Sequence, residues 1–345
     1  MNGSNRNKQG KKVVFENDPF YLYPLKDDLM FVDREEEVQI ARGLLMTGYK
    51  GTVEICAVIG GIGIGKSSML NFIGSLAAGM GHQVTYLNAN DRLAGTDTVK
   101  PGEKTRAVLI VDDVDKADDE RARLFYTELG KVQPTGSVIF FADTYDRSAG
   151  TSALRNHTVS HNISLPQRLQ KERLTYFLEE RMRKCLAPGK GTADFAVPFD
   201  DNAIEMAATR SKGNLRNFLN YTKHAWMAAT GQSRDRVGRA ELKTGMLSID
   251  RALLGGCDII DMKILWFSTA GDMNKALLAL RCGVDARTVD ARMAGRLSEF
   301  LEEGRTGKET FITSVYRRFA EGEDLMRNII MGLGYHLSDV TGLKD

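Results

Sequence analysis

The most constraining feature of the chain is a glycine-rich stretch at 60–68 that reads Gly-Gly-Ile-Gly-Ile-Gly-Lys-Ser-Ser. It follows an apolar run at 53–59 that is typical of a buried strand, and it precedes a helical pattern over 67–79. A strand, the pattern G-x-x-x-x-G-K-[ST] and a helix together predict a phosphate-binding loop. Glycines let backbone N–H groups turn inward toward an anion, and the helix N-terminus adds its dipole. The candidate binding residues are Gly60, Gly61, Ile62, Gly63, Ile64, Gly65, Lys66, Ser67 and Ser68.

Two residues at the end of this loop have separate expected roles. Lys66 is expected to reach the β- and γ-phosphates of a nucleoside triphosphate, and the Ser67 hydroxyl is placed to ligate Mg²⁺. Glycine-rich turns also join many strands to helices without binding anything. The full eight-residue pattern between a strand and a helix favours nucleotide binding, so ATP and Mg²⁺ are the expected ligands.

A second nucleotide signal lies at 107–113, which reads Ala-Val-Leu-Ile-Val-Asp-Asp. The apolar run predicts a strand buried on both faces. Such a strand would bring Asp112 to the edge of the sheet, where it could hold Mg²⁺ through water. Asp113 stands where many P-loop ATPases have a glutamate that polarises the attacking water. Because aspartate is one methylene shorter, we expect slow hydrolysis or a role for the nucleotide as a switch. Two capping acids at a strand end are the alternative interpretation.

The order of the segments predicts the fold class. Apolar runs at 83–88, 137–142 and 159–165 alternate with helical patterns, which is typical of an α/β, doubly wound parallel sheet. After residue 166 helical periodicity dominates. We therefore expect a basic, disordered tail at 1–24, a P-loop α/β domain at 25–165, an α-helical lid at 166–232 and a C-terminal domain at 246–345.

Composition excludes several classes of protein. The net charge is only +2, so the overall charge does not indicate a nucleic-acid-binding protein. The four cysteines form no C-x-x-C pair, and no apolar run approaches the ~20 residues that a membrane helix needs. These features predict a reduced, cytoplasmic protein that has no membrane partner.

Three short stretches, together with the two nucleotide motifs, suggest a family. Residues 31–37 read Phe-Val-Asp-Arg-Glu-Glu-Glu, residues 86–88 read Tyr-Leu-Asn, and residues 213–218 read Gly-Asn-Leu-Arg-Asn-Phe. In these stretches the chain resembles AAA+ ATPases. The relevant branch contains the replication-initiator (origin-recognition) ATPases, the Tn7-type transposition regulators and the archaeal signalling ATPases. The resemblance covers about 31–230.

The resemblance implies roles for single residues. Phe31 and Val32 would pack near the adenine. Asp143 and Thr144 follow the strand that carries the family's polar sensor 1, and Arg216 would be the sensor 2 arginine that reaches the γ-phosphate. The arginine finger, which acts on a neighbouring subunit's nucleotide, is Arg155 or else Arg147, with an ordinary surface arginine as the competing interpretation.

The C-terminal region has a winged-helix pattern. Helical patterns at 259–269, 274–282 and 285–303 are followed by a possible wing at 308–317. The third helix would enter a DNA major groove, with contacts from Arg287, Arg292 and Arg296. However, residues 258–345 contain 12 Lys and Arg against 14 Asp and Glu. Winged helices also dock proteins, so a protein partner is the alternative to DNA.

The sequence leaves two functional hypotheses open. The first is an ATP-switched AAA+ protein that self-associates and acts on duplex DNA, in replication initiation or in target selection for a mobile element. The alternative is a STAND-type signalling ATPase whose C-terminal domain docks a protein, which Asp113 favours. A small-molecule kinase is a weaker third interpretation, because the sequence contains no recognisable binding site for a phosphate acceptor.

Overall fold

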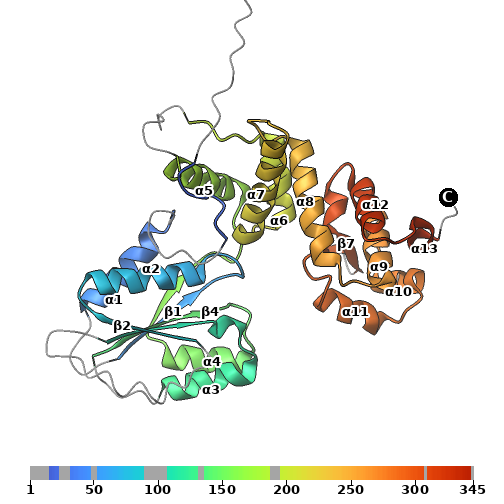
Figure 1. The fold of residues 1–345 in the computed structure, drawn as a ribbon. Helices are drawn as coiled ribbons and strands as arrows, with labels where there is room; N and C mark the ends of the chain where they lie inside the picture. Colours follow the sequence, from blue (N-terminus) through green and yellow to red (C-terminus); the bar gives the residue numbers. More distant parts are fainter. Residues whose placement is uncertain are drawn as a thin grey trace, which may run out of the picture. The chain divides into compact units, whose positions relative to one another are not determined.

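The computed structural model describes residues 15–22, 32–47, 53–88, 107–130, 136–186, 195–306 and 309–342. Phe31 and most of the expected tail at 1–24 lie outside these residues. The chain divides into two compact units, shown in Figure 1. Unit 2 consists of 11–197 and 213–219, and unit 1 of 1–10, 198–212 and 220–345. No helix among the described residues combines the length and the apolar character that crossing a membrane requires.

Unit 2 is built on a five-stranded parallel sheet with the strand order β2-β3-β4-β1-β5. Its strands are β1 (Glu54–Ile59), β2 (Gln83–Asn88), β3 (Ala107–Asp112), β4 (Val138–Asp143) and β5 (His161–Ser164). The α/β doubly wound sheet predicted from the sequence is therefore confirmed. The central strands β1, β3 and β4 are almost entirely buried, which explains their unbroken apolar sequences.

The pairing register aligns the carboxyl ends of the strands. Ile59 at the end of β1 pairs with Asp143 at the end of β4, and Asn88 at the end of β2 pairs with Asp112 at the end of β3. All strands run parallel, so the loops that follow them gather at one edge of the sheet. In open α/β sheets this edge is where ligands bind.

Helices cover both faces of this sheet (Figure 1). One face carries α1 (Glu35–Thr47) and α2 (Lys66–Gly79), and the other carries α3 (Asp119–Leu129) and α4 (Ala149–Thr158). Phe125 and Tyr126 of α3 pack edge-to-face on Phe141 of β4, with ring centroids 5.2 and 5.8 Å away. These aromatic contacts anchor α3 on its face of the sheet. The last helix wholly in unit 2 is α5 (Lys171–Lys184).

Unit 1 is mostly helical, and α7 (Leu215–Gly231) passes from unit 2 into it. Its other elements are α6 (Asp201–Ser211), α8 (Arg239–Leu254), α9 (Ile259–Ala270), α10 (Lys275–Cys282), α11 (Ala286–Ala294), β6 (Leu301–Thr306), β7 (Glu309–Ser314), α12 (Gly322–Gly332) and α13 (Leu337–Thr341). The 3₁₀ helix η3 (Val315–Arg318) follows β7.

The helix predicted over 285–303 is wrong in its second half. The helix α11 ends at Ala294, and β6 begins at Leu301 and pairs antiparallel with β7. The apolar residues that suggested one long helical face, among them Leu297 and Phe300, are buried in the turn between helix and strand. The expected wing is consequently a hairpin over 301–314, earlier in the chain than predicted.

A fully buried ion pair lies in unit 1 between Arg210 of α6 and Asp250 of α8, with 2.7 Å between Nη2 and Oδ1. The hydroxyls of Tyr221 and Tyr316 both donate to Asp250, at 3.0 and 2.7 Å. Burial is the largest influence and lowers the pKa of Arg210, but Asp250, Tyr316 and Tyr221 together raise it more, so the pKa lies above its ordinary value. This network joins α6, α7, α8 and η3 through one buried carboxylate.

Candidate nucleotide-binding site

The glycine-rich loop joins β1 to α2 in the conformation that its sequence predicts. Gly63 and Gly65 have φ values of +74° and +105°, in the left-handed region that glycine tolerates. A Cβ at Gly63 would also lie 2.4 Å from Oδ1 of Asn214. The backbone angle therefore favours glycine at Gly63, and a larger residue there would also displace the Asn214 side chain.

Lys66, the first residue of α2, is only 5% exposed and has three acceptors. Its Nζ donates to the carbonyl oxygens of Gly60 and Gly61, at 3.0 and 2.7 Å. It also lies 3.1 Å from Oδ2 of Asp115. The lysine is thus folded back over its own loop, and a phosphate oxygen that binds it would have to replace one of these acceptors.

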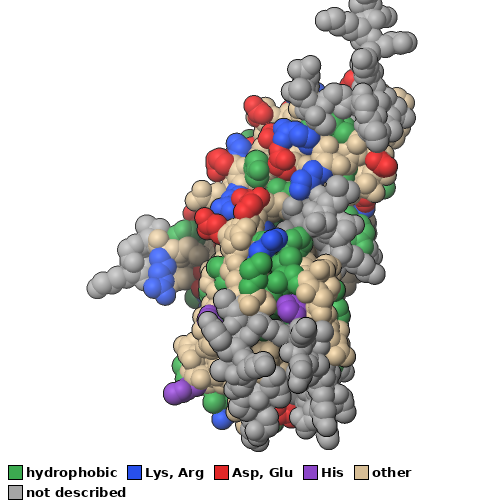
Figure 2. Space-filling model, turned by 90° about the vertical axis from the view of Figure 1, so that its left-hand side faces the viewer, with side chains coloured by type: hydrophobic (Ala, Val, Ile, Leu, Met, Phe, Trp, Pro, Cys, Tyr) green, Lys and Arg blue, Asp and Glu red, His purple; other side chains and the backbone are tan. Residues whose placement is uncertain are grey.

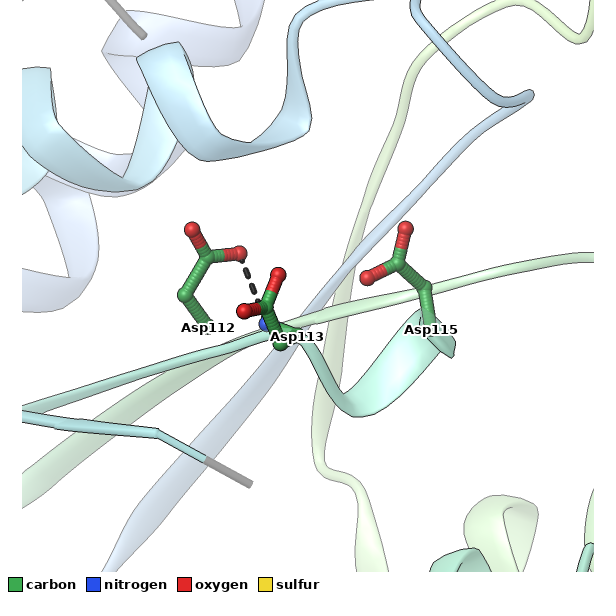
Figure 3. A group of neighbouring side chains, drawn as sticks. All are labelled: Asp112, Asp113 and Asp115. Atoms are coloured by element: carbon green, nitrogen blue, oxygen red, sulfur yellow. Dashed lines mark hydrogen bonds between the residues drawn. The ribbon is translucent and has the colours of Figure 1, made fainter. Parts of the chain in front are cut away.

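An acidic group faces the loop from the end of β3. Figure 3 shows Asp112, Asp113 and Asp115, of which each offers one carboxylate oxygen within 4.8 Å of the others. The Ser67 hydroxyl donates to Oδ1 of Asp112 at 3.1 Å. Carboxylate and hydroxyl oxygens are suitable ligands for Mg²⁺. Ser67 and Asp112 could therefore hold Mg²⁺ in the manner expected from the sequence.

Asp113 has an unusual backbone and two side-chain donors. Its φ is +64°, and its backbone N–H donates to Asp112 Oδ1 at 2.8 Å. Asn88 Nδ2 donates to its carboxylate at 2.9 Å, and Lys116 forms an ion pair with it. The hydrogen bond from Lys116 lowers the pKa of Asp113 despite partial burial. The carboxylate is thus ionised and is held by two donors.

The residues at the expected sensor 1 position form a different, closed cluster. Asp143 is completely buried and accepts from Tyr126 Oη at 2.5 Å and from Arg147 Nε and Arg155 Nη1 at 3.0 Å each. Arg155 also donates to the carbonyl of Thr144 at 2.9 Å. Both arginine-finger candidates therefore bind the Asp143 carboxylate of their own chain.

A cavity of about 200 Å³ opens beside the loop, entirely within unit 2. It is lined by Tyr21, Leu22, Ile62, Gly63, Gly65, Lys66, Ser67, Ser68, Asp115, Lys116, Arg181, Leu215, Arg216 and Leu219. The start of α7 is fixed to the loop, because Asn214 Nδ2 donates to the Ile62 carbonyl at 2.9 Å and Arg216 N to the Gly63 carbonyl at 3.2 Å. This contact brings the exposed Arg216 side chain to the cavity.

The structure gathers some of the sequence-predicted residues and separates others. Lys66, Ser67 and Arg216 meet at the cavity, whereas Val32 is buried and is not among the residues that line it. Seven lining residues were missed from the sequence, of which three are charged: Asp115, Lys116 and Arg181. The three aspartates at 112, 113 and 115 were a sequence signal that could have identified Asp115. Arg181 gave no such signal, because it is one charged residue within the helical pattern of α5.

The three arginines predicted to contact DNA lie in unit 1. Arg287 is exposed at the start of α11. Arg292 instead forms ion pairs with Asp258 and Asp261, at 2.7 and 3.1 Å. Arg296 donates to the Gly256 carbonyl at 2.7 Å. Two of the three guanidinium groups therefore already have partners inside the chain.

Comparison with models of known families, and with curated proteins, finds no match to this sequence. Solved structures do match. The Aeropyrum pernix Orc1 protein in complex with DNA has 13% identity and a TM-score of 0.51, over 88% of this chain and 96% of that one. Cdc6p from Pyrobaculum aerophilum also has 13% identity and a TM-score of 0.51, over 93% and 99%. These similarities show that the chain has the AAA+ P-loop fold.

A third structure has higher identity but a weaker fit. Thermotoga maritima RuvB, a Holliday junction branch migration motor, is 20% identical over 93% of this chain and 100% of that one. Its TM-score of 0.49 is too low to support an argument about the fold.

Proposed function

We propose that this protein is an AAA+ ATPase that binds ATP with Mg²⁺, hydrolyses it slowly and uses it as a switch in an activity on DNA. One observation supports the nucleotide part above all others. Lys66 and Ser67, at the end of a glycine-rich loop, directly contact Asp115 and Asp112 beside a cavity at the carboxyl edge of a parallel sheet. This arrangement offers a cation to phosphate and oxygen ligands to Mg²⁺ in the same place.

The proposed switch passes through α7. The first turn of this helix is bonded to the loop through Asn214 and Arg216, and the helix continues from unit 2 into unit 1. Arg216 would bind the γ-phosphate in the ATP state. When the phosphate leaves, that contact is lost, and we expect the orientation of α7 relative to the loop to change. The nucleotide would thereby control how the C-terminal elements of unit 1 are presented.

DNA is the proposed partner for two reasons. The fold is shared with the Orc1 protein, whose solved structure contains DNA. In addition, the C-terminal elements α9, α10 and α11 followed by the β6–β7 hairpin have the order of a winged helix, with Arg287 exposed on the third helix. The same proposal includes self-association. The activity on DNA would be replication initiation or target selection for a mobile element. Arg155 or Arg147 could act on a neighbour's nucleotide only after it leaves Asp143.

The alternative is a signalling ATPase that docks a protein. Arg292 and Arg296 are held inside the chain, and the C-terminal region carries slightly more acidic than basic residues. Figure 2 shows one face of the molecule, on which acidic and basic side chains are interspersed over the upper part instead of forming one basic area. DNA-binding domains usually present a basic stripe, so the two held arginines and the charge balance of the C-terminal region favour the alternative.

One experiment tests the proposal and separates the alternatives. The full chain is titrated with duplex DNA in a filter-binding assay, with and without ATP and Mg²⁺, at several salt concentrations, and its size is measured under the same conditions. ATP-dependent binding with a steep salt dependence would support an activity on DNA, because phosphate contacts release counterions. Binding that is absent at every salt concentration, in a protein that does bind ATP, would favour protein docking.

The matched variant is Lys66→Ala, examined by calorimetric titration with ATP. Removing a charge-assisted bond to phosphate should weaken ATP binding by about 1.5–3 kcal/mol, which is roughly 10- to 150-fold. If the variant binds ATP as tightly as the parent protein, the assignment of the loop is wrong.

A further inference from the structure

Arg181 is a buried cation in the nucleotide cavity that the proposed phosphate chemistry does not use. It lies on α5, is 5% exposed, and borders the cavity together with Tyr21, Leu22, Leu215 and Leu219. Its Nη1 donates to the Tyr21 carbonyl at 3.2 Å. Its Nε is buried and has no hydrogen-bond partner among the described residues.

The lack of a carboxylate partner distinguishes Arg181 from the other buried cations of the described residues. Lys66 lies 3.1 Å from Asp115, Arg210 lies 2.7 Å from Asp250, and Arg34 lies 3.9 Å from Glu37. Within the described part of the chain, Arg181 alone among these four has no carboxylate oxygen within 4.0 Å. Burial lowers its pKa to about 10. Asp18 favours the charged form, but less than burial opposes it. A buried charge without a close ion-pair partner is costly, so a ligand that supplies an acceptor would be bound with a substantial gain.

The residues that line the cavity are of two chemical kinds. The loop residues from Gly63 to Ser68 supply backbone N–H groups, an ammonium and hydroxyls, which suit phosphates. The side chains of Leu22, Leu215 and Leu219 supply an apolar wall. Ligand pockets typically combine such apolar walls with a few polar groups that fix orientation. The apolar lining residues therefore suit a purine base and its ribose. Arg181 donates to the carbonyl of Tyr21, the residue before Leu22, so it lies at the Leu22 part of this lining.

We propose that Arg181 is a nucleotide-binding residue that donates a hydrogen bond to an acceptor on the base or ribose of the bound nucleoside triphosphate. The inference rests on the proposed function, since it requires that this cavity bind a nucleotide. The acceptors available on adenosine are the ring nitrogens and the ribose oxygens. Arg181 would then determine affinity for the nucleoside part, while Lys66 determines affinity for the phosphates.

The test compares two ligands on two variants. ATP and inorganic tripolyphosphate, each with Mg²⁺, are titrated calorimetrically into the full chain, into Arg181→Met and into Arg183→Met. Arg183 is the matched control, because it lies on the same helix, pairs with Glu180 and has a side chain that is 38% exposed. We expect Arg181→Met to weaken ATP binding roughly 10- to 100-fold and to leave tripolyphosphate binding unchanged. Arg183→Met should change neither affinity.

Three results would overturn the proposal. One is an equal loss of ATP and tripolyphosphate affinity in Arg181→Met, which would place the residue at the phosphates. Another is no loss for either ligand. The third is a large fall in the melting temperature of the nucleotide-free variant, which would assign Arg181 a structural role. Methionine removes a buried charge at similar volume, so we expect the melting temperature to stay the same or rise. A parent protein that binds neither ligand would instead refute the proposed function itself.

Discussion

At the scale of single residues, the two donors that hold Asp113 affect the chemistry expected of it. The carboxylate accepts from Asn88 and Lys116, so its basicity is reduced while it is held in this position. Aspartate also reaches less far than the glutamate usual at this position. Both effects are consistent with the slow hydrolysis in the proposed function.

We predict that Asp113→Asn retains ATP binding and loses hydrolysis. The amide cannot accept a proton from the attacking water, whereas Ser67 and Asp112 remain available for Mg²⁺. A calorimetric titration measures binding, and phosphate release measures turnover. Unchanged turnover would move the catalytic role to another carboxylate, with Asp112 as the next candidate.

The same contacts predict the opposite effect for Asn88→Ala and Lys116→Met. Each change removes one donor from Asp113, so the freed carboxylate should hydrolyse ATP faster than in the parent protein. Slower hydrolysis in both variants would mean that the donors position Asp113 productively.

The same ion pair predicts how the stability of the fold depends on pH. A folded-state pKa below the ordinary 3.8 means that the Asp113–Lys116 pair stabilises the fold above that pH, and that this contribution is lost as the pH falls through the lowered value. Lys116→Met should weaken that dependence in acid unfolding experiments, and the hydrogen bond from Asn88 should preserve the rest.

At the scale of elements, Arg292 connects α11 to the start of α9. Asp258 caps α9 by accepting from the N–H groups of Ile260 and Asp261, and Arg292 binds both aspartates from the neighbouring helix. Asp261 is completely buried, and Arg292 is its nearer cationic partner, at 3.1 Å against 3.8 Å for Arg296. Arg292 thus has a structural role that the sequence did not indicate. Arg287 is exposed, so it is the better residue with which to test DNA contact.

We predict that Arg292→Ala and Arg287→Ala separate stability from DNA binding. Arg292→Ala should lower the free energy of unfolding by about 1–3 kcal/mol, because a buried carboxylate loses its donor. Arg287→Ala should change stability by less than about 0.5 kcal/mol. It should lower the salt dependence of DNA binding by about 0.9, the value for one phosphate contact. An unchanged salt dependence in Arg287→Ala would exclude phosphate contact by this residue.

At the scale of the whole molecule, the buried pair of Arg210 and Asp250 makes several elements of unit 1 depend on one another. The pair and the two tyrosines on Asp250 connect α6, α7, α8 and η3. Because these elements share one buried carboxylate, a movement of α7 should be felt as far as η3. We therefore expect unit 1 to respond to the nucleotide as a single body.

We predict that Arg210→Met lowers the free energy of unfolding of unit 1 by about 3–5 kcal/mol, because Asp250 would remain as a buried, unpaired charge. The double variant Arg210→Met/Asp250→Leu should recover part of this loss. The only two tryptophans, Trp226 and Trp266, both lie in unit 1, so their fluorescence in a urea titration follows that unit alone. A double variant that is less stable than Arg210→Met would show that the two tyrosines depend on Asp250 more than Arg210 does.

The local part of the site was predictable from the sequence because its signals are local. The glycines at Gly63 and Gly65, the lysine and hydroxyl after them, and the acids after an apolar strand are each contiguous in the chain. Backbone freedom and the ordering of strand, loop and helix are properties of such short segments. The parallel sheet followed from the same alternation of segments, and the fold comparison confirmed it.

The partners of charged residues were decided only by the tertiary structure. Arg155, Arg292 and Arg181 look alike in the sequence, yet one binds a buried carboxylate, one joins two helices, and one borders a cavity without an acid partner. The second half of the predicted helix at 285–303 became a turn and the start of β6, because β7 was available to pair with that strand. A sequence determines which local conformations are favourable, whereas long-range pairing depends on which segments the fold brings together.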